Sequence, residues 1–167
     1  MKQLFTLLTL TILVMAGCVE TKVQEDVVVL SEQGLNASHL LADTIVYSVD
    51  LVNTDSLDTW SDWRLRNMNT SKLVEEVFDN VYSGRLQAYD YFTDAALTVE
   101  DVRNLEVTPN YARSLIEEIQ FEETWLFSPE LQIFHKEVHS FVLAYALYAQ
   151  NGERMGLKPV FRVRLEN

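Results

Sequence analysis

Apolar and polar side chains alternate through most of the C-terminal third of the chain, and this period of two constrains the fold more than any other feature. Residues 119–127 alternate, with interruptions only at Glu123 and Leu126. Residues 134–149 fit both a helix and a strand, but the turn-rich residues 150–156 and the alternating residues 159–165 favour a strand. The sequence therefore predicts antiparallel strands that end in a C-terminal hairpin.

One segment, residues 71–82, has the periodicity of an amphipathic helix, with apolar residues on one face. Asn69 offers an N-cap oxygen, and Gly84 supplies the stop. A second helix is expected to begin at Thr98, whose spacing to Asp101 fits a capping box.

The remaining elements are a third helix beginning near Pro109 and three strands, at residues 27–30, 45–49 and 85–92. Together the elements predict an α+β fold, in which two to three helices pack on one face of an antiparallel sheet with a C-terminal hairpin.

The N-terminus has the features of a bacterial lipoprotein signal. An uncharged, mostly apolar stretch at residues 4–16 is too short for a membrane span of about 20 residues. Residues 15–18, Met-Ala-Gly-Cys, resemble the lipobox, and Cys18 is the one Cys of the sequence. We therefore expect a lipoprotein signal peptide at 1–17, a lipidated tether at 18–26 and a single α+β domain at 27–167.

The amino-acid composition limits the classes of partner that the chain is expected to bind. The sequence has 25 acidic and 13 basic residues, a formal net charge of −12, and no basic cluster of the kind that phosphate backbones require. Nucleic acid is therefore not expected as a partner. Through the lipid at Cys18 we expect attachment to the bacterial outer membrane, on its periplasmic side, with the cell surface as the alternative.

The residues that could carry chemistry do not form a recognisable catalytic pattern. On a strand, His135 and His139 would lie about 13 Å apart, too far to share one metal ion. The acid pairs at 75–76, 117–118 and 122–123 are interpreted as solvated surface, because adjacent carboxylates cannot flank a glycosidic bond. The glycine patterns of a nucleophile elbow or a phosphate loop are missing. We expect no catalytic residue, no metal site and no cofactor.

The most unusual segment, residues 58–69, contains two of the three Trp of the chain. Trp60, Trp63, Arg64 and Arg66 combine the side chains most enriched at the centres of protein interfaces, and they form the candidate partner-binding site. Two alternatives remain at this stage. The Trp side chains could fill the core while the two Arg pair with the acidic surface, or they could form a platform for a sugar.

Four segments between Trp60 and about Phe141 carry a family resemblance. They are Trp-Ser-Asp-Trp-Arg at 60–64, Ser-Gly-Arg-Leu-Gln-Ala-Tyr-Asp at 83–90, Phe-Glu-Glu-Thr-Trp-Leu-Phe at 121–127 and Phe-His-Lys-Glu-Val at 134–138. In their order and texture the chain resembles the GldN/PorN family, periplasmic components of the gliding-motility and type IX secretion machinery of Bacteroidetes. The resemblance implies a structural or accessory part of an envelope assembly, which could be oligomeric.

The sequence thus favours a lipid-anchored, non-enzymatic envelope protein that binds protein partners. The alternatives are a ligand- or glycan-binding lipoprotein that presents Trp60 and Trp63, and an envelope hydrolase that uses clustered carboxylates or His135.

Overall fold

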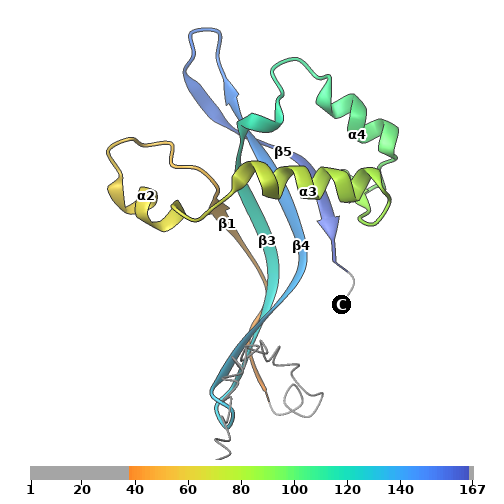
Figure 1. Cartoon of the computed structure of the whole chain (residues 1–167). Coiled ribbons are helices and arrows are strands. Elements are labelled where there is room, and N and C mark those ends of the chain that lie inside the picture. The colour runs from red at the N-terminus through yellow and green to blue at the C-terminus, as the bar shows by residue number, and fades with distance from the viewer. Residues whose placement is uncertain (1–37, 166–167) are drawn as a thin grey trace, which may run out of the picture. The chain divides into compact units, whose positions relative to one another are not determined.

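The computed structural model describes residues 38–165, which all lie in one of the two compact units of the chain, residues 31–167. Its strands form one antiparallel sheet in the order β1-β3-β4-β5-β2 (Figure 1). The strands are β1 His39–Asp50, β2 Ala88–Tyr89, β3 Ile116–Ser128, β4 Ile133–Tyr148 and β5 Arg154–Arg164. The helices are α2 Thr59–Leu65, α3 Thr70–Tyr82, α4 Val99–Glu106 and the 3-10 turn Arg113–Leu115. The fold is α+β, as predicted.

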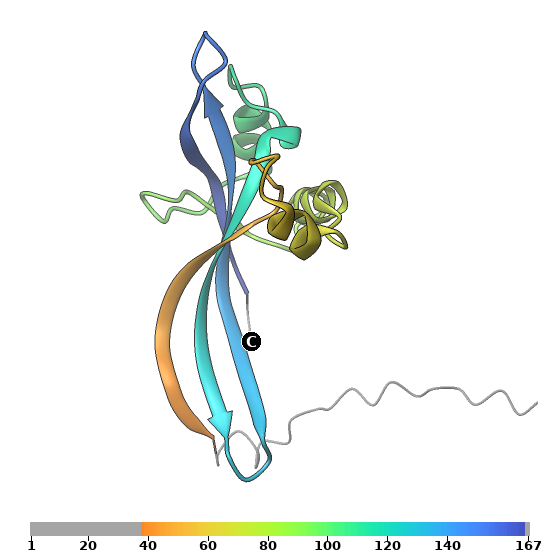
Figure 2. The same cartoon turned by 90° about the vertical axis from the view of Figure 1, so that its left-hand side faces the viewer.

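The three α-helices of the described residues lie on the same side of the sheet (Figure 2). The amphipathic pattern of α3 explains its position, because its apolar face packs on the sheet and Phe78 meets Phe161 of β5 edge to face at 5.2 Å. The buried hydrophobic residues around this contact are Leu51, Val74, Val77, Phe78, Val81, Ala88, Val102, Ile116, Ile119, Phe141, Leu143, Tyr145, Val160, Phe161 and Val163.

The predicted C-terminal hairpin is confirmed. Strands β4 and β5 pair antiparallel from Ser140↔Arg164 to Tyr148↔Arg154, and Gly152 adopts a φ of 83° in the turn between them. The predicted helix at 71–82 is confirmed as α3, with the Asn69 side chain accepting a hydrogen bond from the Lys72 N–H.

The capping box predicted at Thr98 is also confirmed. The Thr98 hydroxyl accepts from the Asp101 N–H at 3.1 Å, and the Asp101 carboxylate accepts from the Thr98 N–H at 2.8 Å. Two donors at the start of α4 are thereby satisfied.

Two predicted elements are wrong. The strand predicted at 85–92 shrinks to Ala88–Tyr89, because the Asp90 carboxylate accepts hydrogen bonds from the N–H groups of Phe92 and Thr93 and folds the chain into a turn. The helix predicted near Pro109 is only the 3-10 turn Arg113–Leu115, since Asn110 has a left-handed φ of 67° that a helix cannot contain.

Of the two other predicted strands, one is confirmed and the other is not tested. The strand at 45–49 is confirmed inside β1, which is longer than expected. The strand predicted at 27–30 lies outside the described residues. Helix α2 was not predicted at all.

The distal halves of β1, β3 and β4 project past the helices (Figures 1 and 2). We call this part the arm and define it as residues 39–45, 122–128 and 133–139. Its ladders contain irregularities, between Leu40 and Ile45 in the β1–β3 pair and at Glu122/Glu123 in the β3–β4 pair. Because α3 covers only the proximal part of the sheet, large apolar side chains such as Leu40 and Phe134 are exposed on the arm.

Candidate functional site

The segment singled out by its Trp and Arg content folds into α2. Asp58 caps this helix by accepting hydrogen bonds from the N–H groups of Trp60 and Ser61, both at 3.1 Å, and from the Ser61 hydroxyl at 2.6 Å. The hydrogen bonds from Ser61, foremost that of its hydroxyl, lower the pKa of the Asp58 carboxyl below its ordinary value. The cap therefore carries a negative charge at neutral pH and holds a helix of only seven residues.

The side chains of Trp60, Trp63 and Arg66 pack on one another at α2 and its C-cap. The two indole rings lie 4.8 Å apart at an interplanar angle of 18°. The guanidinium of Arg66 lies over the Trp63 ring, 4.4 Å from its centre, and Arg66 Nη1 donates to the Trp63 carbonyl at 2.7 Å. Successive members are three residues apart, and residues at this spacing are neighbours on a helix surface. We call this arrangement the Trp–Arg stack.

The Trp–Arg stack is exposed. Trp60 is 63% and Trp63 54% exposed, so the alternative in which they fill the core is wrong. Leu57 and Met68, at either end of the segment, are exposed as well. Large apolar side chains held in a fixed arrangement lose little conformational entropy when a partner covers them, so the stack is suited to an interface.

Arg64, the fourth residue predicted for the site, is not part of the stack. It points to the end of β1, where its Nη2 forms an ion pair with Asp50 at 3.1 Å. Both side chains are largely solvated, so the pair contributes about 0–1 kcal/mol. The structure therefore brings together three of the four predicted side chains and gives Arg64 a role in fixing α2 against the sheet.

A buried carboxylate on the arm was missed from the sequence. Glu123 is 3% exposed, which overturns the interpretation of the 122–123 pair as solvated surface. Its carboxylate accepts hydrogen bonds from the Tyr47 hydroxyl and the Trp125 Nε1–H, both at 2.8 Å, and pairs with Lys136 Nζ at 3.2 Å. The Lys136 ammonium lies 4.8 Å and 4.7 Å from the centres of the Tyr47 and Trp125 rings. This cluster ties the three strands of the arm together.

Burial works to raise the pKa of Glu123, but the hydrogen bonds from Trp125, Tyr47 and Lys136 outweigh it and lower the pKa below the ordinary 4.5. A lowered pKa in the folded state stabilises the fold above pH 4.5, and this contribution is lost as the pH falls through the folded-state pKa. The wild-type melting temperature should therefore drop in that acidic range.

Glu123→Gln should lower the stability at pH 7 by about 2–3 kcal/mol, because charge-assisted hydrogen bonds are lost and an amide N–H₂ faces three donors. The variant should also lose less stability than the wild type between pH 5 and 3. Thermal melts across this range measure both effects. Glu122→Gln is the matched control, since Glu122 accepts one hydrogen bond from Ser140 and is not in the cluster. Parallel acid profiles for Glu123→Gln and the wild type would contradict the assignment.

The two His of β4 do not share a site. His139 lies at the irregularity opposite Glu122/Glu123, and its Nε2 is 2.7 Å from the Thr124 hydroxyl, whereas His135 pairs with Leu126 in the ladder. Among residues 38–165, no three His, Cys, Asp or Glu side chains are grouped as metal ligands would be.

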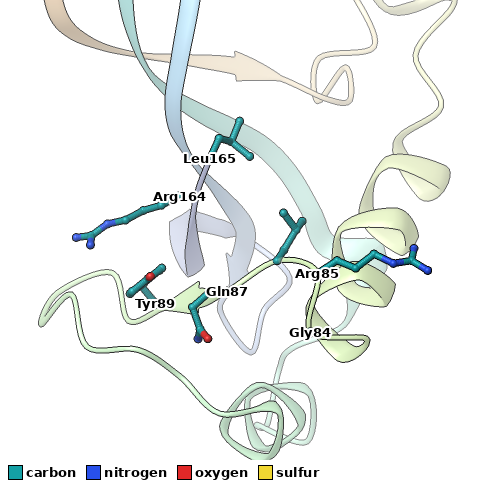
Figure 3. A pocket seen from close by; sticks show the side chains of 7 residues that line it. Gly84, Arg85, Gln87, Tyr89, Arg164 and Leu165 are labelled. Atoms are coloured by element: carbon teal, nitrogen blue, oxygen red, sulfur yellow. The ribbon is translucent and has the colours of Figure 1, made fainter. Parts of the chain in front are cut away.

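An open hollow of about 670 Å³ lies between the chain after α3 and the end of β5 (Figure 3). Its two cations, Arg85 and Arg164, point in opposite directions. Arg164 forms an ion pair with Asp94, and Arg85 donates to Asn80 at 3.3 Å. The hollow therefore offers no convergent charge to a ligand.

A second depression, of about 350 Å³, runs between α3 and the sheet and is almost wholly apolar, with Leu73, Val77, Phe121, Val138 and Phe141 among its walls. It supplies few polar groups that could orient a ligand.

Neither a model of a known protein family nor a curated protein matches this chain. Within the part of the chain that the structure describes, none of the helices has the length and apolar composition needed to cross a membrane.

Proposed function

We propose that this chain is a lipid-anchored, non-enzymatic protein of the bacterial cell envelope that binds a protein partner through the Trp–Arg stack. The exposure of the stacked Trp60 and Trp63 side chains carries the proposal, because an isolated domain gains nothing from leaving two indoles in water. Attachment through Cys18 and a location at the outer membrane, facing the periplasm, belong to the same proposal.

The resemblance to the GldN/PorN family supports a more specific version, in which the partner is part of a gliding-motility or secretion assembly. The protein would then be a structural or accessory component. No nucleic acid, cofactor or metal is part of the proposal.

The geometry of the stack favours a protein over a glycan. A sugar platform needs a free aromatic face, but the Trp63 ring is in contact with both the Trp60 indole and the Arg66 guanidinium. The exposed parts of the two indoles and the guanidinium remain available to a protein surface.

Affinity purification with crosslinking from native envelopes tests the proposal, with the full-length chain as bait. Trp63→Ala and Arg66→Ala should weaken capture of the partner about 30-fold, since removing an interface anchor costs about 2 kcal/mol or more. Their melting temperatures should stay nearly unchanged, because exposed positions contribute little to folding.

Phe92→Ala is the matched control, since Phe92 is an aromatic residue that is 78% exposed on a different loop. It should bind like the wild type, and Arg64→Ala should have a smaller effect than Arg66→Ala. If the Trp63 and Arg66 variants capture partners as well as the Phe92 variant does, the stack is not the binding site. Copurification of gliding-motility or secretion components would support the specific version.

A further inference from the structure

Among the described residues, the outer edge of β1 has no neighbouring strand. Strand β1 ends the sheet, and among residues 38–165 no strand pairs with its outer side (Figure 1). The Leu51 N–H donates to the Glu117 carbonyl at 2.8 Å, which fixes the direction of the alternating backbone groups of the strand. The N–H and C=O groups of Val46, Ser48 and Asp50 therefore point away from β3, where no strand of the described residues pairs with them.

The half of β1 nearest α2 has little that normally protects an edge, apart from Asp50 at its end, which pairs with Arg64. The irregularities of β1 lie in the other half of the strand, between Leu40 and Ile45, where Thr44 has a φ of 50°. From Ile45 to Asp50 the strand pairs regularly with β3 and contains neither Pro nor Lys. A regular, unprotected edge is a template for an added strand.

One face beside this edge is acidic. The Ser48 hydroxyl donates to the Glu118 carboxylate at 2.9 Å, which holds that carboxylate over β1 and toward the free edge. Glu122 lies four residues further along β3 on the same face, where it accepts from the Ser140 hydroxyl of β4 at 2.8 Å, away from the free edge. Within the described part of the chain, neither carboxylate forms an ion pair.

The other face beside the edge is mainly apolar. Tyr47 and Val49 lie on it next to Phe121 and Ile119 of β3, and Ile45 lies next to Glu123, whose partner Lys136 sits over the Tyr47 ring. A strand added to β1 would therefore place every second side chain against mainly apolar neighbours and the others on the face that carries Glu118.

We propose that the edge of β1 at 46–50 binds an extended segment of a partner protein in which Lys or Arg alternates with apolar, β-branched residues. The charge pattern selects this occupant. A second copy of the chain would bring its own acidic face and its own charge of −12 to the edge, and residues 27–30 contain no cation. The proposal goes beyond the Trp–Arg stack, because the edge engages a partner through its backbone.

The test uses the mature chain, residues 18–167, with Cys18→Ser, and a fluorescent eight-residue peptide of alternating Val and Lys. Binding should protect the amides of Val46 and Ser48 from deuterium exchange and should weaken with added salt. An alternating Val and Glu peptide and a peptide with four Val followed by four Lys should bind at least tenfold more weakly, as estimated for the loss of charge pairing or alternation (about 1.4 kcal/mol).

Two variants locate the contact. Val46→Pro removes one outward N–H without touching the ladder to β3, and it should weaken binding about tenfold while Val46→Ala binds like the wild type. Glu118→Lys should reverse the preference, from the Val/Lys peptide to the Val/Glu peptide. Melting curves show that each variant is folded. The two variants test different parts of the proposal, Val46→Pro the backbone pairing and Glu118→Lys the charge preference.

Several outcomes would overturn the proposal. Equal binding by Val46→Pro and Val46→Ala would do so, as would the lack of a preference for the cationic peptide. If the amides of Val46 and Ser48 are already protected in the free chain, the edge would be assigned to residues 27–30. If their protection rises with protein concentration, the edge would be assigned to a second copy. Trp63→Ala should leave peptide binding unchanged, so failure at this edge is distinct from failure of the Trp–Arg stack.

Discussion

Replacing Val163 by Asp is expected to unfold the domain. Val163 is fully buried in β5, in the core that also contains Phe161 and Phe78, and it pairs with Phe141 of β4. An unpaired carboxylate there costs several kcal/mol, against a total stability of about 5–15 kcal/mol for a domain of this size. Circular dichroism and thermal melting of the purified variant should show no cooperative transition, or one at a much lower temperature.

Arg162→Asp is the matched control, because it changes the neighbouring residue on the opposite face of the strand. Arg162 forms an ion pair with Asp94 at 3.5 Å and lies over the Tyr91 ring, with its side chain partly buried. Its loss should cost about 1–2 kcal/mol, since a partly exposed pair is weak and the new carboxylate meets Asp94. Equal melting temperatures for the two variants would mean that the faces of β5 are assigned wrongly.

Replacing Cys18 by Ala is expected to move the protein from the membrane fraction to the soluble fraction, or to leave it as an unprocessed precursor. Cys18 lies outside the described residues, so this prediction rests on the lipobox resemblance. Buried acyl chains contribute about 0.8 kcal/mol per CH₂, which makes a diacylglycerol a far stronger membrane attachment than any single side chain.

Fractionation of cells that express the wild type or Cys18→Ala measures the shift, and metabolic labelling with a fatty acid shows whether the wild type carries lipid. The Trp63→Ala variant, which keeps Cys18, should stay in the membrane fraction. A wild type without label, together with an unchanged distribution of Cys18→Ala, would remove lipidation from the proposed function.

The parts of the fold that the sequence predicts well are those decided by local periodicity. The alternation in β3 and β5 and the three-to-four spacing in α3 each place one face in the core, so the elements and their buried sides follow from the pattern. The capping box at Thr98 is equally local. The failed predictions at 85–92 and 109 involve single residues, Asp90 and Asn110, whose turn conformations interrupt otherwise plausible elements.

The candidate sites also differ in how far local sequence patterns predict them. The sequence identified the residues of the Trp–Arg stack but not their arrangement, although the spacing of Trp60, Trp63 and Arg66 and the possible cap at Asp58 were signals of a short helix. The cluster at Glu123 could not be found this way, because its Tyr47 partner is 76 residues away in the chain. The alternation in β3 did hold one hint, since it places Glu123 on the apolar side.

The course of β1 has a mechanical consequence. The strand begins at His39, on the side of the chain that leads back to Cys18, and ends at Asp50, where Arg64 of α2 is attached. If Cys18 carries the proposed lipid and the Trp–Arg stack binds the proposed partner, a pull between them would travel along the covalent backbone of β1. An extended strand already has about 3.3 Å per residue and can lengthen little. The covalent backbone of β1 would then carry most of the load, and the hydrogen bonds between the strands would carry little of it.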